Sequence, residues 1–302
     1  MSDQFKSGFV SMMGRTNVGK SSIMNALVNE KVAAIANKPQ TTRNAIRAIV
    51  NRTDSQIIFI DTPGIHKPKS KLGNTMIDTA FGVISDVDVI LFVIEATSKT
   101  IGKGDRIILD KIKESNKKVI LIINKVDLVN KEEIAELINL YKDEYNFESI
   151  IPVSVTKKTN LDVIIDEIKK HLKVGPAYYS IEEYTDQTMR QLVEETIREK
   201  ALRLLDDEVP HGIYVETEKM KERETKAGEP IYDVDATIYC LRNSHKGIII
   251  GKEGKMLKRI ASYARTDLEK MLDIKINLKV WVKVKDDWLN NDNLIKKFKL
   301  QQ

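Results

Sequence analysis

Two glycines, a lysine and a serine near the start of the chain have the types and the spacing that phosphate chemistry needs. They lie in the octapeptide Gly14-Arg15-Thr16-Asn17-Val18-Gly19-Lys20-Ser21, which matches G-x-x-x-x-G-K-[ST]. The strand-like run Phe9–Met13 precedes it, and a helical pattern from Ser22 follows. Glycines let backbone N–H groups face a phosphate, and a helix start adds the positive end of its dipole. We expect Lys20 to contact the β- and γ-phosphates of a nucleoside triphosphate and Ser21 to ligate Mg²⁺.

A second motif, Asp61-Thr62-Pro63-Gly64, follows the strand candidate Gln56–Ile60. A carboxylate at this place can hold the hydration shell of Mg²⁺, and the Gly64 N–H can meet a γ-phosphate. We therefore include Asp61, with Ser21, among the metal ligands.

A third motif, Asn124-Lys125-Val126-Asp127, follows the strand candidate Val119–Ile123. Asp127 can accept hydrogen bonds from both N1–H and the exocyclic amine of guanine, a donor pair that adenine lacks. The Lys125 stem can cover the base, and Asn124 can tie this loop to the phosphate-binding loop. The stretch Ser154-Val155-Thr156 ends the next strand and can offer an N–H to the guanine carbonyl. Any one tetrapeptide is weak evidence, but three motifs in order at strand ends predict a guanine nucleotide site.

These motifs need a sheet whose strand ends meet at one edge. Residues 5 to about 172 alternate strand and helix patterns, which predicts a mixed, mostly parallel α/β sheet with its ligand loops at the strand C-termini. A polar turn at residues 51–55 predicts one antiparallel hairpin at the sheet edge. The strand candidates are Phe9–Met13, Ile46–Asn51, Gln56–Ile60, Val87–Ile94, Val119–Ile123 and Ile150–Val153, with helices at Ser22–Asn29, Thr75–Ile84, Gly104–Glu114, Glu132–Tyr141 and Leu161–His171.

The first half resembles GTPases of the translation-factor-related class. The resemblance implies a first switch at residues 37–43, where Thr42, with Thr41 as the alternative, closes over Mg²⁺ and the γ-phosphate. It implies a second switch from Asp61 to about Gly73. Ras-like GTPases carry a water-orienting Gln directly after the switch II glycine, and here that position is Ile65. We expect slow intrinsic hydrolysis, with Lys20, Thr42, Gly64 and Asn17 as the catalytic set. In some relatives the residue equivalent to Asn17 coordinates K⁺, which we carry over as a hypothesis.

The second half has a different pattern of elements. A helix is predicted at Thr188–Leu205, strands at Ile213–Lys219 and Ile231–Arg242 around a charged hairpin loop at Lys221–Glu229, a second pair of helices ending at Leu272, and a strand at Ile274–Lys285. The segment Ile-Gly-Lys-Glu-Gly at 250–254 separates the last two helices. This order resembles an α+β KH domain of type II, whose G-x-x-G loop lets a sugar–phosphate backbone approach while an apolar groove takes about four unpaired bases. The resemblance implies an RNA-binding set of Ile250, Gly251, Lys252, Glu253, Gly254, Lys255, Lys258 and Arg259.

Composition agrees with two domains and allows an anionic partner. The chain has 302 residues, a formal net charge of +5 and a single cysteine, Cys240, so it has no intramolecular disulfide and suits a reducing compartment. The N-terminus has no apolar signal core and no stretch is long enough to span a membrane, so we expect a cytoplasmic protein. We expect a GTPase domain at residues 1–175, a linker at 176–186 and a KH domain at 187–302.

The two halves together resemble the Era family, bacterial GTPases with a C-terminal KH domain. The resemblance implies a switch that binds and hydrolyses GTP, uses Mg²⁺, binds the 3′ end of 16S rRNA and acts in assembly of the 30S subunit, as a monomer that also associates peripherally with the inner face of the cell membrane. The alternative is a membrane-associated regulatory GTPase whose basic second half docks on lipid or a protein partner. DNA binding through the same groove is a third interpretation.

Overall fold

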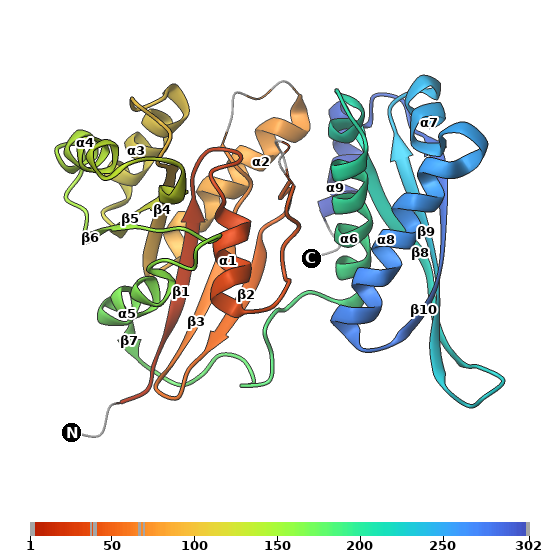
Figure 1. Cartoon of the computed structure of the whole chain (residues 1–302), viewed down its shortest axis with the longest axis horizontal. Helices are drawn as coiled ribbons and strands as arrows, with labels where there is room; N and C mark the ends of the chain where they lie inside the picture. The colour runs from red at the N-terminus through yellow and green to blue at the C-terminus, as the bar shows by residue number, and fades with distance from the viewer. Residues whose placement is uncertain (1–3, 37, 39–40, 66–67, 69, 300–302) are drawn as a thin grey trace. The chain divides into compact units, whose positions relative to one another are not determined.

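The computed structural model describes residues 4–36, 38, 41–65, 68 and 70–299 of the chain (Figure 1). The expected switch I residues 37, 39 and 40 and switch II residues 66, 67 and 69 lie outside these ranges. The chain divides into two compact units. The first comprises Met1–Ala33, Thr42–Lys69 and Gly73–Asp186, and the second comprises Ala34–Thr41, Ser70–Leu72 and Gln187–Gln302.

The first unit is built on a mixed sheet of strand order β2-β3-β1-β4-β5-β6. Its strands are β1 (Lys6–Met13), β2 (Ile46–Asn51), β3 (Ser55–Asp61), β4 (Val89–Glu95), β5 (Lys118–Asn124), β6 (Ser149–Pro152) and β7 (Lys173–Val174). The expected antiparallel hairpin is β2–β3, with β2 at the edge, and the pairings β3–β1–β4–β5–β6 are parallel. The short β7, which sequence patterning missed, pairs antiparallel with the start of β1.

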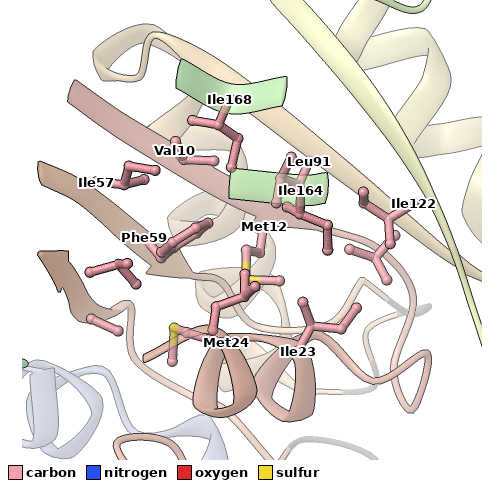
Figure 2. Close-up of a cluster of buried hydrophobic side chains, with 14 of the residues drawn as sticks. Val10, Met12, Ile23, Met24, Ile57, Phe59, Leu91, Ile122, Ile164 and Ile168 are labelled. Carbon is pink, nitrogen blue, oxygen red and sulfur yellow. The ribbon is translucent and has the colours of Figure 1, made fainter. Parts of the chain in front are cut away.

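Helices cover both faces of this sheet. They are α1 (Lys20–Val28), α2 (Lys71–Gly82), α3 (Lys103–Ser115), α4 (Lys131–Lys142) and α5 (Leu161–His171), with 3-10 turns η1 (Val83–Asp86) and η2 (Val126–Leu128). One core joins α1 and α5 to the sheet: Ile23 and Met24 of α1 and Ile164 and Ile168 of α5 pack with Phe59 and other strand residues (Figure 2). A second core joins α3 and α4 to the opposite face. Because β4 and β5 are buried on both sides, they consist of continuous apolar runs.

Residues 176–186, expected to be a linker, belong to the first unit and run beside its edge hairpin. Gln56 accepts from the N–H groups of Tyr178 and Tyr179 at 2.7 and 3.0 Å, and Thr185 forms a bridge with Ala48 of β2. The segment lacks a periodic pattern because hydrogen bonds and two separate rings hold it instead of a continuous apolar face: Tyr178 lies 4.9 Å from the Phe9 ring, and Tyr184 packs against the core.

The second unit is a three-stranded sheet with helices packed on it. Its elements are α6 (Met189–Leu204), η3 (Val209–Gly212), β8 (Tyr214–Glu224), β9 (Pro230–Cys240), α7 (Asn243–Ile250), η4 (Lys252–Gly254), α8 (Lys255–Leu272), β10 (Lys275–Val284), η5 (Trp288–Asn290) and α9 (Asp292–Lys299). The strand order is β10-β9-β8, with β8–β9 antiparallel and β9–β10 parallel. The core joins the inner faces of all three strands to α6, α7 and α8. This is the α+β arrangement that the sequence pattern predicts.

The expected hairpin loop at Lys221–Glu229 is wrong in extent, because β8 continues to Glu224. Both faces of this stretch are polar, so no alternation of apolar residues marks it. Cross-strand polar pairs hold it: Arg223 Nε lies 2.7 Å from Asp233 Oδ2, and the Tyr232 hydroxyl donates to Glu222 at 2.9 Å.

Candidate nucleotide site and RNA-binding loop

The phosphate-binding loop lies between β1 and α1 and surrounds the Lys20 ammonium. Gly19 begins α1 with φ +99°, and a Cβ there would lie 2.2 Å from the Asn124 amide, so only glycine fits. Lys20 is 6 % exposed and donates to the carbonyls of Gly14 and Arg15 at 3.0 and 2.9 Å. Burial lowers the pKa of Lys20 to about 8. The loop therefore holds a buried ammonium group at the position where phosphates are expected.

Three oxygens that the sequence assigned to Mg²⁺ converge beside this loop. Asp61 Oδ2 accepts from the hydroxyls of Ser21 and Thr42 at 2.7 and 2.9 Å, and those hydroxyls are 3.1 Å apart. Asp61 Oδ1 is buried and has no hydrogen-bond partner among the residues that the structure describes, and burial raises the pKa of this carboxyl against the attraction of Lys20. An orphaned carboxylate oxygen with two hydroxyls is an all-oxygen donor set, which suits a hard cation such as Mg²⁺. Thr41 instead donates to the Lys38 carbonyl at 2.7 Å.

The start of switch II is packed against the phosphate-binding loop. The Ile65 N–H donates to the Gly14 carbonyl at 3.2 Å, and a Cβ on Gly64 would lie 2.8 Å from Thr16 Cα. Ile65 is 3 % exposed, and the Thr62 hydroxyl donates to the Met12 carbonyl at 2.7 Å. The residue at the glutamine position of Ras-like enzymes thus contributes packing and has no polar group for a water.

The residues expected to read guanine lie at the ends of β5 and β6. The Ser154 hydroxyl donates to Asp127 Oδ1 at 2.5 Å, which orients an exposed carboxylate. The Asn124 amide donates to the Val18 carbonyl at 2.9 Å, and the Lys125 ammonium to the Asn17 carbonyl at 2.8 Å. Two hydrogen bonds therefore tie this loop to the phosphate-binding loop. Val126, Val155 and Thr156 follow in the same loops.

One ion pair beside the site was missed by sequence reasoning. Arg15 Nε donates to Asp105 Oδ1 of α3 at 2.9 Å, and Arg15 Nη2 donates to the Ser98 hydroxyl at 2.8 Å. The Asp105 side chain is fully buried, and burial raises the pKa of this carboxyl against the attraction of Arg15. No spacing rule marks residues 15 and 105 as partners, because only the fold brings them together.

The G-x-x-G loop separates α7 from α8 in the second unit. Gly251 and Gly254 have φ +71° and +73°, and Glu253 between them also has a positive φ of 54°. A Cβ on Gly251 would lie 2.7 Å from Met256 Cβ, whereas no atom of the described part of the chain lies within 4 Å of a Cβ on Gly254. This open, strained turn leaves room at Gly254 for the sugar–phosphate backbone of a nucleic acid to approach.

Cations surround the turn on the exposed side of α8. Lys252, Lys255, Lys258 and Arg259 are exposed, and Lys255 pairs with Glu253 at 2.9 Å. The Arg259 guanidinium lies 5.5 Å from the centre of the Tyr263 ring, and Tyr263 is 47 % exposed. Tyr263, which sequence reasoning did not select, supplies an aromatic surface beside the loop; its spacing of four from Arg259 was the available signal.

Comparison with known proteins bears on both units. Residues 9–125 match the family described as 50S ribosome-binding GTPase, and residues 208–289 match the KH domain family. The chain is 51 % identical over 293 residues to GTPase Era of Caldanaerobacter subterraneus subsp. tengcongensis, covering 97 % of each chain, and 50 % identical over 295 residues to GTPase Era of Clostridioides difficile, covering 97 % and 98 %. This chain belongs to the Era family of GTPases.

Solved Era structures share the whole fold. One, of Era in complex with MgGDPNP and nucleotides 1506–1542 of 16S ribosomal RNA, has a TM-score of 0.92 at 36 % identity and covers 97 % of this chain and 98 % of its own. Another, of a single-residue variant of Aquifex aeolicus Era bound to GDP·AlF₄⁻, has the same TM-score and identity over 97 % and 99 %. Among the described residues of this member of the Era family, no helix combines the length and the apolar character needed to cross a bilayer.

Proposed function

We propose that this member of the Era family binds the 3′ end of 16S rRNA through residues 250–259 and uses GTP hydrolysis to time a step of 30S subunit assembly. The observation that carries the proposal is the convergence of Ser21, Thr42 and Asp61 in one unit of a chain whose other unit presents an open G-x-x-G loop. The related Era complex with MgGDPNP and 16S rRNA supports the ligand identities. We further propose that the protein acts as a cytoplasmic monomer with peripheral membrane association.

The chemistry follows from the positions of the charged and polar groups. Ser21 and Thr42 would hold Mg²⁺ directly and Asp61 through its hydration shell. The metal, when bound, neutralises charge on the β- and γ-phosphates. Lys20 stabilises the same charge from a dry environment, where the interaction is stronger than in water. Asp127, oriented by Ser154, selects guanine. Since the Ile65 side chain has no polar atom, backbone groups or a partner would orient the attacking water, and we expect intrinsic hydrolysis to be slow.

A monovalent cation is proposed as a further element of catalysis. Asn17 is exposed on the phosphate-binding loop with a positive φ of 65°, a conformation that turns its backbone away from the regular helical path. K⁺ held there would supply positive charge beside the phosphates. Hydrolysis measured in K⁺ and in Na⁺ buffers tests this: equal rates, or an unchanged K⁺ response in Asn17→Ala, contradict the cation site.

The switch is proposed to act through the segment before Thr42. Residues Ala34–Thr41 belong to the second unit, whereas Thr42 belongs to the first. The Arg203 guanidinium donates to the Ile35 carbonyl at 2.8 Å, and the Arg198 guanidinium donates to the Thr41 carbonyl. Thr42 already contacts Ser21 and Asp61, so GTP and the metal would hold it there, and its release after hydrolysis would change the adjacent peptide that Arg198 holds. By linkage, RNA binding that favours the GTP state tightens GTP binding equally.

RNA crosslinking and sequencing of the purified protein tests this function. We expect one single-stranded rRNA segment to crosslink around residues 251–258 with a non-hydrolysable GTP analogue and much less with GDP. In the variant Gly251→Asp/Gly254→Asp, two carboxylates would repel the phosphates and crosslinking there should be lost. Diffuse, nucleotide-independent recovery would contradict the switch, and binding of anionic vesicles without RNA selectivity would favour a membrane-docking GTPase.

A further inference from the structure

The sheet of the second unit carries its core on one face and a row of lysines with a tryptophan on the other. Figure 1 shows α6 and α8 on the same side of β8–β10, and the buried residues of the strands point to that side. Along β10 the inward positions include Ile276 and Val282, which are 3 % and 7 % exposed. The alternate residues face outward, and from 275 to 285 they comprise Lys275, Asn277, Lys279, Trp281, Lys283 and Lys285. We call these six residues the open β10 row.

Trp281 is the centre of this row and is unusually accessible for its type. It is 44 % exposed, and its cross-strand neighbour Thr237 on β9 is completely buried beneath the surrounding side chains. Lys279 and Lys283 flank Trp281 at two residues on either side, so they are separated by about 13 Å along the strand. An exposed indole between two ammonium groups resembles the stacking platforms of proteins that bind single strands.

The neighbouring contacts fix the geometry of the row and neutralise part of its charge, because Lys275 and Lys283 each pair with a glutamate. Lys283 pairs with Glu218 at 2.8 Å, and Lys285 Nζ lies 5.4 Å from the centre of the Tyr239 ring. Lys279, in contrast, has no ion pair among the residues that the structure describes. The open β10 row itself contains four lysines and no acidic residue, whereas the β9 residues opposite Asn277 and Lys279 are Asp233 and Asp235.

Protection of a sheet edge explains only part of this arrangement. β10 is an edge strand, and lysines on edge strands prevent pairing with other chains. That role does not call for a half-exposed tryptophan, whose apolar surface would favour association. The indole and the lysines together are explained by a partner that has both phosphates and flat aromatic groups.

We propose that the open β10 row is a second RNA site, separate from the G-x-x-G loop, in which one unpaired base stacks on Trp281 while Lys279 and Lys283 contact phosphates on either side. The site rests on the proposed function only in that RNA is the ligand. Stacking on an aromatic ring is tolerant of sequence, so this surface adds affinity for a single strand without selecting its bases. The site would hold either the continuation of an RNA strand bound at the G-x-x-G loop or a second RNA strand.

The two tryptophans allow a direct test in the full-length protein. Trp288 is 1 % exposed and donates to the Gly212 carbonyl at 3.0 Å, so it is shielded from ligands, whereas Trp281 is accessible. Oligoriboadenylate should therefore quench tryptophan emission through Trp281. Quenching should persist in Gly251→Asp/Gly254→Asp, where the loop is disabled, and disappear in Trp281→Phe, which keeps an aromatic ring and the fold.

The contribution of the open β10 row to RNA affinity can be measured in the Gly251→Asp/Gly254→Asp variant, from the fluorescence anisotropy of labelled oligoriboadenylate. We expect Trp281→Ala to weaken binding about tenfold, and Lys279→Glu/Lys283→Glu to weaken it with a smaller dependence on salt, because two phosphate contacts are lost. The control variant Lys131→Glu/Lys142→Glu replaces two exposed lysines of α4 and changes the net charge by the same amount. It should bind RNA as tightly as the Gly251→Asp/Gly254→Asp parent.

Three results would overturn the proposal. Emission that RNA does not change, or equal affinity in Trp281→Ala, would show that no base stacks there. Quenching by anionic vesicles but not by RNA would assign the surface to lipid. If disabling the loop abolishes all RNA binding, the second site fails while the proposed function stands; if the wild-type chain binds no RNA, the proposed function fails as well.

Discussion

The buried ammonium of Lys20 should destabilise the nucleotide-free protein in a way that depends on pH. Its pKa falls from the ordinary value of 10.5 to about 8, because burial removes water from the charge. Folding lowers the pKa of this cation, so its charged form destabilises the folded state. The full destabilisation applies below the folded-state pKa, and it disappears as the pH rises from the folded-state pKa to the unfolded-state pKa. For these two pKa values the penalty is about 3 kcal/mol at pH 7.5 and about 1 kcal/mol at pH 9.5.

The variant Lys20→Met removes this charge and with it the pH dependence. Lys20→Met should therefore gain more stability over the wild type at pH 7.5 than at pH 9.5. The difference between their free energies of unfolding should fall by about 2 kcal/mol from pH 7.5 to pH 9.5. The difference at a single pH also includes two lost hydrogen bonds and the lost attraction for Asp61. The change with pH is diagnostic because other lysines titrate equally in both proteins.

Urea denaturation of the nucleotide-free chain is the assay. Both tryptophans, Trp281 and Trp288, lie in the second unit, so a circular dichroism transition that tryptophan fluorescence does not follow belongs to the first. The exposed Lys142→Met on α4 is the matched control and should show no change of this kind. A difference between Lys20→Met and the wild type that stays constant from pH 7.5 to 9.5 would refute the reasoning.

Three further predictions follow from single contacts. Asp127→Asn should lower GTP affinity about a hundredfold in competition binding, because we propose that the carboxylate accepts hydrogen bonds from two guanine N–H groups; unchanged affinity would mean that other residues recognise the base. Asp105→Ala should lower the free energy of unfolding, measured in urea, by about 2 kcal/mol. This is less than the full cost of breaking a buried ion pair, because the Arg15 side chain is 29 % exposed. Asp110→Ala, at an exposed position of the same helix, should leave the free energy of unfolding unchanged. Burial raises the pKa of Glu194 to about 7, so its contribution to stability should be greatest below pH 4.5 and lost as pH rises to 7. Glu194→Gln should flatten that slope in the tryptophan-monitored transition, and equal slopes would contradict it.

The features that can be predicted from the sequence are those in which a local pattern and a chemical requirement coincide. The buried strands β4 and β5 are continuous apolar runs, and the motifs ending at Ser21, Gly64 and Asp127 follow strands in order, so both fold class and motif order could be predicted. The edge hairpin β2–β3 was predicted from one polar turn. These features depend on a few neighbouring residues and on the parallel topology that they imply.

The features that sequence reasoning missed depend on contacts between distant residues. Arg15 and Asp105 are ninety positions apart and meet because the fold brings the start of α3 beside the phosphate-binding loop. The end of β8 has polar residues on both faces, so only pairs such as Arg223 with Asp233 reveal it as a strand. The accessibility of Trp281 likewise depends on which sheet face the helices cover, which an alternating pattern alone does not tell.

The antiparallel pairing of β7 with β1 brings together the two ends of a long stretch of chain. Val174 lies opposite Lys6, and the Gly175 N–H donates to the Phe5 carbonyl at 3.1 Å. Units whose ends meet in this way are the ones that tolerate circular permutation and insertion into other proteins. A short peptide joining these two points, with new ends opened in the polar turn between β2 and β3, would keep every strand pairing of the sheet. The stretch from Lys6 to Val174 can therefore be circularly permuted without changing which of its strands pair.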